Sequence, residues 1–156
     1  MKVSWKRVLI AGLIVIAVAL AVTIAVSIIN AGSPLRVASD TWDVTFPDGA
    51  QVESSASESS PMGDGYRYVA VSVPKDSDSA ATILDPAQFS AGHPSAQEQE
   101  TIRGVLTTLQ IDGADAREAA AGNAHFSYRS VHSEAGDLVV ARSSATGMFY
   151  LFEFMI

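Results

Sequence analysis

The sequence predicts an α+β fold, in which a single N-terminal transmembrane helix is followed by a small antiparallel sheet of about five strands packed by one main helix. Three observations support this prediction. Residues 8–29 carry no charge and are almost entirely apolar. Residues 95–109 combine a helix-start signal with the apolar spacing of an amphipathic helix. The final part of the chain contains three apolar or alternating stretches separated by turn sequences.

The N-terminal apolar run has the length of a membrane-spanning helix. Only one Gly, one Thr and one Ser interrupt Ala, Val, Leu and Ile between Val8 and Ile29. At about 1.5 Å per residue the run extends roughly 33 Å, which is enough to cross a hydrocarbon core of about 30 Å. The sequence therefore predicts an integral, single-pass membrane protein.

The basic residues beside this run predict its orientation. Lys2, Lys6 and Arg7 precede it, and only Arg36 follows it closely. Because basic flanks stay in the cytoplasm, we expect the N-terminus inside and the C-terminal part outside. The expected organisation is a cytoplasmic tip at 1–7, a transmembrane helix at 8–29, a tether at 30–40 and an extracytoplasmic α+β domain at 41–156.

A cleaved secretion signal is the alternative interpretation of the same segment. Ala25, Val26 and Ser27 form a small-x-small sequence of the kind that signal peptidases cut. The apolar run, however, exceeds the roughly 7 to 15 residues of a usual signal core and continues past this sequence. We therefore favour an uncleaved anchor, and both alternatives export the same domain.

The exported part is strongly acidic and contains no cysteine. Residues 30–156 hold seven Lys and Arg against 17 Asp and Glu, a formal charge of −10. Such a charge disfavours nucleic acid and anionic lipid headgroups as partners and favours basic peptides, cationic surfaces or metal ions. The alternative interpretation is that the charge serves only to keep the domain soluble. Without disulfides, the domain must be stabilised by its hydrophobic core.

The first half of the exported part predicts three strands separated by turns and loops. Trp42, Val44 and Phe46 alternate with polar residues, which is typical of a half-buried strand. A turn at 47–49 and a short returning strand at 51–53 follow. The serine-rich stretch 54–60 predicts a mobile loop, because it has little apolar surface to bury. The turn 63–65 then precedes the clearest strand, 66–73.

The middle of the chain predicts the main helix. A short helix is expected at 77–84 and a loop at 86–94. Ser95 and Glu98 form a capping box, after which four apolar residues share one helical stripe. These residues are Ile102, Val105, Leu106 and Leu109. The Ala-rich segment 114–123 extends or restarts the helix and stops at Gly122 and Asn123.

The last part predicts a three-stranded antiparallel meander at 124–131, 137–143 and 147–155. Short turn sequences at 134–137 and 144–147 connect these strands, which must therefore be antiparallel neighbours. In the final strand Glu153 is the only charged residue between two apolar faces. We expect this strand to be central or covered on both faces.

The residues that usually perform chemistry do not form a recognisable site. His93, His125 and His132 lack metal-ligand spacing, and the Ser72–Lys75 match to a Ser-x-x-Lys motif stands beside a proline on a strand end. No calcium loop, nucleophile elbow, phosphate-binding loop or cysteine nucleophile is present. The sequence thus predicts no catalytic residue, no cofactor and no metal site. The residues singled out for an interaction are Asp64, Arg67 and His93.

Three short motifs resemble a loose group of small, membrane-anchored bacterial envelope proteins. They are the Gly-Asp-Gly turn and aromatic strand at 63–69, the aromatic stretch 126–129, and the ending from 136 to 153. In that group a histidine precedes the turn, whereas this chain has Met62. The resemblance implies a bacterial envelope setting and this order of elements, and no activity.

These observations predict a membrane-anchored extracytoplasmic binding or accessory module whose partner is an envelope protein. Two alternatives remain open. One is a cell-wall or peptide hydrolase whose site the linear sequence does not reveal. The other is an assembly subunit that acts through its transmembrane helix, where small residues at 17, 21 and 25 form one stripe.

Overall fold

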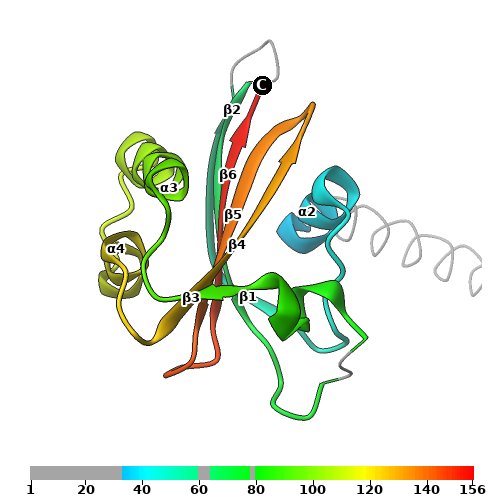
Figure 1. Ribbon diagram of the computed structural model, residues 1–156. Coiled ribbons are helices and arrows are strands. Elements are labelled where there is room, and N and C mark those ends of the chain that lie inside the picture. Colours follow the sequence, from blue (N-terminus) through cyan, green and yellow to red (C-terminus); the bar gives the residue numbers. More distant parts are fainter. Residues whose placement is uncertain (1–32, 60–63, 78–79) are drawn as a thin grey trace, which may run out of the picture. The chain divides into compact units, whose positions relative to one another are not determined.

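A six-stranded antiparallel sheet organises the computed structural model, which describes residues 33–59, 64–77 and 80–156 (Figure 1). The strands lie in the order β1-β2-β6-β5-β4-β3. Their bounds are Gln51–Ser59 for β1, Gly65–Ser72 for β2, Ser90–Ala91 for β3, Phe126–Ser133 for β4, Gly136–Ser143 for β5 and Phe149–Met155 for β6. The sheet thus has one strand more than the sequence indicated.

Three α-helices accompany the sheet in the described part of the chain. They are α2 (Pro34–Trp42), α3 (Ala96–Thr108) and α4 (Ala114–Ala121), and two short 3-10 turns, η1 (Thr82–Leu84) and η2 (Pro86–Gln88), lie between the strands. Residues 38–156 form one compact unit, and the residues before Ala38 belong to a separate unit. The α+β class is therefore confirmed for the part of the chain that the structure describes.

The predicted cytoplasmic tip at 1–7 and transmembrane helix at 8–29 lie outside the described residues. Within the ranges that are described, no helix combines the length and the hydropathy needed to cross a bilayer. Residues 60–63, which include Gly63 of the predicted turn and the preceding Met62, also lie outside them, as do residues 78 and 79.

The predicted C-terminal meander is confirmed. β4 pairs with β5 and β5 pairs with β6, all antiparallel, with Tyr128 opposite Ala141 and Val139 opposite Phe152. β6 also pairs with β2, so the most apolar strand lies in the interior of the sheet. Its residues Phe149 to Glu153 are all buried. The expectation of a central strand covered on both faces is correct.

One face of the sheet is covered by α3 and α4 (Figure 1). Ser95 Oγ accepts a hydrogen bond from the Glu98 N–H, and Glu98 Oε2 accepts one from the Ser95 N–H, so the predicted capping box is present. The apolar stripe that follows is buried against aromatic strand residues, as expected from its spacing. The Tyr128 hydroxyl donates to the Ala119 carbonyl at 2.7 Å and ties α4 to β4. Burial, with a smaller contribution from the Glu98 charge, raises the pKa of Tyr128 to about 12.

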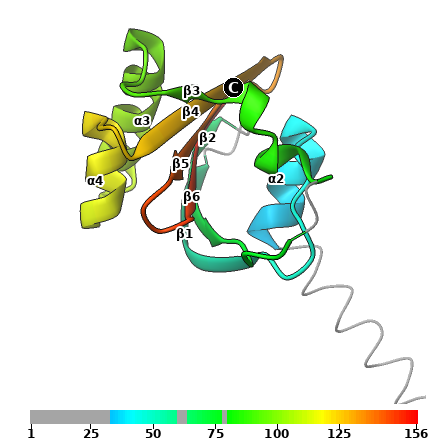
Figure 2. The ribbon, with the colours of Figure 1, turned by 60° about the horizontal axis from the view of Figure 1, so that its bottom comes forward.

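The other face is covered by the end of α2 and by two irregular segments. Trp42, Val44 and Ile83 are almost fully buried there. The two segments hold each other through reciprocal bonds between Thr45 and Thr82, whose hydroxyls accept from each other's backbone N–H at 2.9 and 2.8 Å. Figure 2 shows the η1–η2 segment across the sheet from α3 and α4. The sheet is therefore the middle layer of the domain and makes apolar contacts on both of its faces.

The predicted tether at 30–40 and strand at 41–46 are wrong where the structure describes them. Pro34 begins a helix that continues to Trp42, Asp43 then adopts a left-handed backbone conformation with φ 52°, and residues 44–46 belong to no strand. Proline is favoured at the first helical position, and the buried Ala38 and Trp42 are four residues apart, the spacing of one helix face. The two-residue spacing of Trp42 and Val44 correctly indicated that both are buried, but it does not arise from a paired strand.

The predicted mobile loop at 54–60 is also wrong, because residues up to Ser59 belong to β1. This strand pairs along its length with β2, with a register irregularity between Val52 and Ser54. All but one of its residues are exposed. An edge strand of this kind is fixed by backbone pairing on one side and needs little apolar side-chain burial, which is why composition misidentified it.

The expected helix at 77–84 and loop at 86–94 are short turns in the structure. In the described residues of this stretch, 77 and 80–94, the helical segments are η1 and η2. Asp85 separates them, and its carboxylate accepts a hydrogen bond from the Ala87 N–H. The two-residue strand β3 then pairs with β4 at Tyr128 and Ser127. The prolines at 74 and 86 limit helix growth here.

Replacing Phe152 by aspartate is expected to unfold the domain. The Phe152 side chain is fully buried in the core under α3. An unpaired carboxylate at this position costs several kcal/mol against a total stability of about 5 to 15 kcal/mol. Denaturant or thermal unfolding of the full-length protein in detergent measures the effect. Ile156→Asp, at a residue that is 67% exposed, is the matched control; equal melting curves for the two variants would contradict the assigned core.

Candidate functional site

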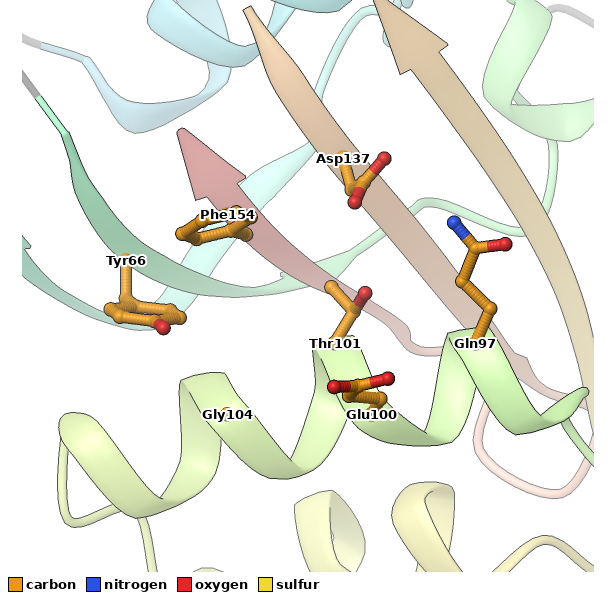
Figure 3. A pocket seen from close by; sticks show the side chains of 7 residues that line it. All are labelled: Tyr66, Gln97, Glu100, Thr101, Gly104, Asp137 and Phe154. Carbon is orange, nitrogen blue, oxygen red and sulfur yellow. The ribbon is translucent and has the colours of Figure 1, made fainter. Parts of the chain in front are cut away.

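A cleft of about 430 Å³ lies between α3 and the sheet. One wall consists of the α3 residues Gln97, Glu100, Thr101 and Gly104, and the floor consists of Tyr66, Asp137 and Phe154 from β2, β5 and β6. Figure 3 shows the two aromatic rings at one end of the cleft and Asp137 near Gln97 at the other. A single helix and three neighbouring strands therefore build the site.

The aromatic end of the cleft is formed by a ring pair beside a glycine. The Tyr66 and Phe154 centroids are 5.2 Å apart with a tilt of 33°, and these residues are directly opposite in the β2–β6 register. A Cβ on Gly104 would lie 3.4 Å from the Tyr66 ring. Glycine costs about 1 kcal/mol relative to alanine inside a helix. At this position the missing side chain leaves space beside the Tyr66 ring.

Two carboxylates line the rest of the cleft. Glu100 is an exposed residue of α3. Asp137 lies at the end of the cleft away from the rings, where its Oδ1 atom is 2.6 Å from His132 Nδ1. Glu58 of β1 is directly opposite Tyr66 in the strand register, so it lies on the same face of the sheet. The cleft is thus negatively charged along its rim.

The neighbouring Glu98 supports α3 and is not free to bind a ligand. Its Oε1 accepts from the Ser130 hydroxyl at 2.6 Å while Oε2 serves the capping box. Burial raises the pKa of Glu98, but the hydrogen bonds from Ser130 and Ser95 outweigh it and the net shift is downward. The carboxylate therefore stays ionised and fixes the start of α3 over β4.

The arrangement of groups suits a cation. Aromatic faces attract ammonium and guanidinium groups, and carboxylates at the rim pair with the same groups. The cleft presents no comparable anion site, because the charged side chains that line it are Glu100 and Asp137. In the described ranges, no three His, Cys, Asp or Glu side chains lie close enough together to hold a metal ion.

A second polar cluster lies inside the core on the opposite face. Glu153 is completely buried, and its Oε2 accepts a hydrogen bond from Trp42 Nε1 at 2.7 Å and faces Arg67 Nη1 at 3.2 Å. Its Oε1 has no hydrogen-bond partner within the described residues. Burial raises the pKa of Glu153, although Trp42 and Arg67 act in the opposite direction.

The three residues predicted to make interactions are not brought together. Arg67 points to the face away from the cleft and pairs with Glu153 in the core. Asp64 is exposed immediately before β2, whereas His93 is exposed after β3, beside Gly122 at the end of α4. β6, β5 and β4 separate β2 from β3. The structure thus assigns Arg67 a place in the core, and a joint role with Asp64 and His93 is not supported by this placement.

Sequence reasoning missed the cleft residues, although one signal was present. Gln97, Glu100, Thr101 and Gly104 recur at helical spacing beside the apolar stripe of α3. These residues form a polar stripe on α3 that ends at a mid-helix glycine. Such a stripe indicates a helix face that lies over the sheet but is not packed into the core. The strand residues of the site, by contrast, come together only through the sheet order.

The buried carboxylate predicts a specific dependence of stability on pH. Because the pKa of Glu153 is raised in the folded state, that state binds more protons than the unfolded chain above the ordinary value of 4.5. This group's contribution to the free energy of unfolding must therefore fall as pH rises from about 4.5 through the raised pKa. We therefore expect the free energy of unfolding of the wild type to fall relative to that of Glu153→Gln as pH rises through this range. Parallel curves would show that the buried carboxylate does not titrate differently on folding.

The chain matches no protein-family model, no curated protein and no solved structure. The envelope-protein resemblance of the short motifs stays a prediction. A function for this protein is accordingly argued from the cleft itself.

Proposed function

We propose that this protein is a membrane-anchored, extracytoplasmic binding module whose cleft receives a cationic side chain of an envelope protein. The observation that carries the proposal is the cleft under α3, where the Tyr66–Phe154 ring pair lies at one end and the carboxylates of Glu100 and Asp137 line the remainder. The apolar run 8–29 and its basic flank support the anchor and the location.

The geometry favours a lysine or arginine side chain over a bulky ligand. The cleft runs along α3, with its rings at one end and the polar side chains of Gln97, Glu100 and Asp137 along the rest. A long aliphatic stem can pack on the rings while its charged head reaches Glu100 or Asp137. The negative charge of the exported part adds long-range attraction for a basic partner.

Titration with a single cationic side chain tests this use of the cleft. The probe is Nα-acetyl-arginine methylamide, with the citrulline analogue as its neutral control, and NMR shifts of the Gly104 amide and Tyr66 ring report binding. We expect the arginine compound alone to shift these signals. The double variant Glu100→Gln/Asp137→Asn should weaken binding about fivefold, since each exposed ion pair contributes up to about 1 kcal/mol.

Two further variants separate the cleft from general electrostatics. Gly104→Leu fills the space beside Tyr66 and should abolish the shifts while the helix remains stable. Glu118→Gln, on the exposed side of α4, removes a charge away from the cleft and should leave binding unchanged. Equal shifts by both compounds, or an undisturbed response in Gly104→Leu, would contradict the proposed site.

The location is tested on intact cells. Protease added outside should degrade residues beyond the apolar run while sparing cytoplasmic markers, since the basic flank predicts an exported C-terminal part. A reporter cysteine at Ser57, introduced into this cysteine-free chain, should react with a membrane-impermeant maleimide. Full protection in both assays would show that the domain is not exported.

A further inference from the structure

The two edges of the sheet differ in a way that suggests a second interaction surface. At one edge β3 has only two residues, so it offers little backbone for pairing. At the other edge β1 has nine residues, and within the described part of the chain no strand pairs with its outer side. Natural sheets usually protect such edges with lysine, proline or very short strands. β1 contains neither lysine nor proline.

The stretch Ser54–Ser59 is regular. It pairs with β2 residue by residue from Ala70 to Gly65, after the irregularity that follows Val52. Its side chains are Ser, Ala and Glu only. Small side chains leave room for whatever residues an added strand would place opposite them. Within the described residues, the backbone N–H and C=O groups on the outer side pair with no strand.

We propose that the outer edge of β1 is a strand-addition site, at which an extended basic segment of a protein partner pairs with Ser54–Ser59 as a seventh strand. The proposal rests on the proposed function, because it specifies how the partner that fills the cleft is held. Backbone hydrogen bonds would supply affinity, and alternate side chains of the added strand would supply specificity.

The charges of β1 select a basic occupant. Glu53 and Glu58 are the charged residues of this strand, and in the described structure the Glu58 carboxylate takes part in no ion pair. A lysine or arginine across from Glu58 would form a favourable cross-strand pair. A second copy of this chain would instead bring together two β1 strands with the same acidic residues and two domains of the same negative charge.

The edge is also connected to the cleft. Ala56 and Glu58 lie opposite Tyr68 and Tyr66, so they share the face on which α3 packs. Alternate side chains of an added strand would project over this face next to Ala56 and Glu58, with β1 between them and Tyr66 of the cleft. The edge and the cleft therefore lie on the same face of the sheet, one strand apart.

Hydrogen exchange on the full-length protein in detergent tests the proposal. The probe is an acetylated and amidated eight-residue peptide that alternates lysine with valine. Its controls are the same peptide with glutamate for lysine and the same basic peptide N-methylated on one strand edge. We expect the basic peptide to slow exchange of outward-facing amides in Ser54–Ser59 at least tenfold, and both controls to have no such effect. Glu58→Lys should weaken binding severalfold, and Glu118→Lys on α4 is its matched control.

The outcomes distinguish this inference from the proposed function. If the basic and N-methylated peptides shift the Gly104 and Tyr66 signals equally without protecting β1, the cleft binds cations and strand addition is refuted. If β1 is protected in Gly104→Leu as in the wild type, strand addition is supported while the cleft is dispensable. Protection of β1 without peptide would mean that the edge is already occupied. The occupant would be a second copy if the protection depends on protein concentration, and the chain's own remaining residues if the protection does not. Either result would overturn the inference.

Discussion

Burial of β6 on both faces is the constraint on which the rest of this domain depends. Its even-numbered residues pack under α3, and its odd-numbered residues face the layer that contains Trp42, Val44 and Ile83. In a domain without cysteine, the stability must come from these two apolar contacts. The pairing of β6 with both β2 and β5 then fixes where Tyr66, Asp137 and Phe154 emerge beside α3. The cleft is a consequence of how the core is assembled.

The same packing explains the cluster around Glu153. A strand covered on both faces has no exposed position for a charge, so its one carboxylate is buried and must find partners there. Trp42 and Arg67 supply them from distant parts of the sequence. Such a pair is costly to bury and strongly destabilising to break, which makes it a poor source of net stability but a strict condition on how the surrounding segments pack.

Local signals predicted those parts of the fold that local chemistry determines. The Ser95–Glu98 capping box and the apolar stripe after it located α3, and the tight turns between the last strands required antiparallel neighbours. The sequence failed where pairing or packing with distant residues decides. Ser54–Ser59 is a strand because its backbone pairs with β2. Thr41 and Trp42 end a helix, although the burial of Trp42 and Val44 has the two-residue period of a strand. The cleft combines a readable polar stripe on α3 with strand residues that only the sheet order brings together.

The unequal lengths of β1 and β3 have a consequence for assembly. A sheet with two long free edges can grow without limit, because each added copy presents a new edge to the next. Here the two-residue β3 closes one side, so lateral growth has a single open end. Copies of this chain that joined through β1 would stop at a pair, because neither copy has a second long edge in the part of the chain that the structure describes. A protein can carry an accessible strand on its surface under these conditions and still remain a discrete particle.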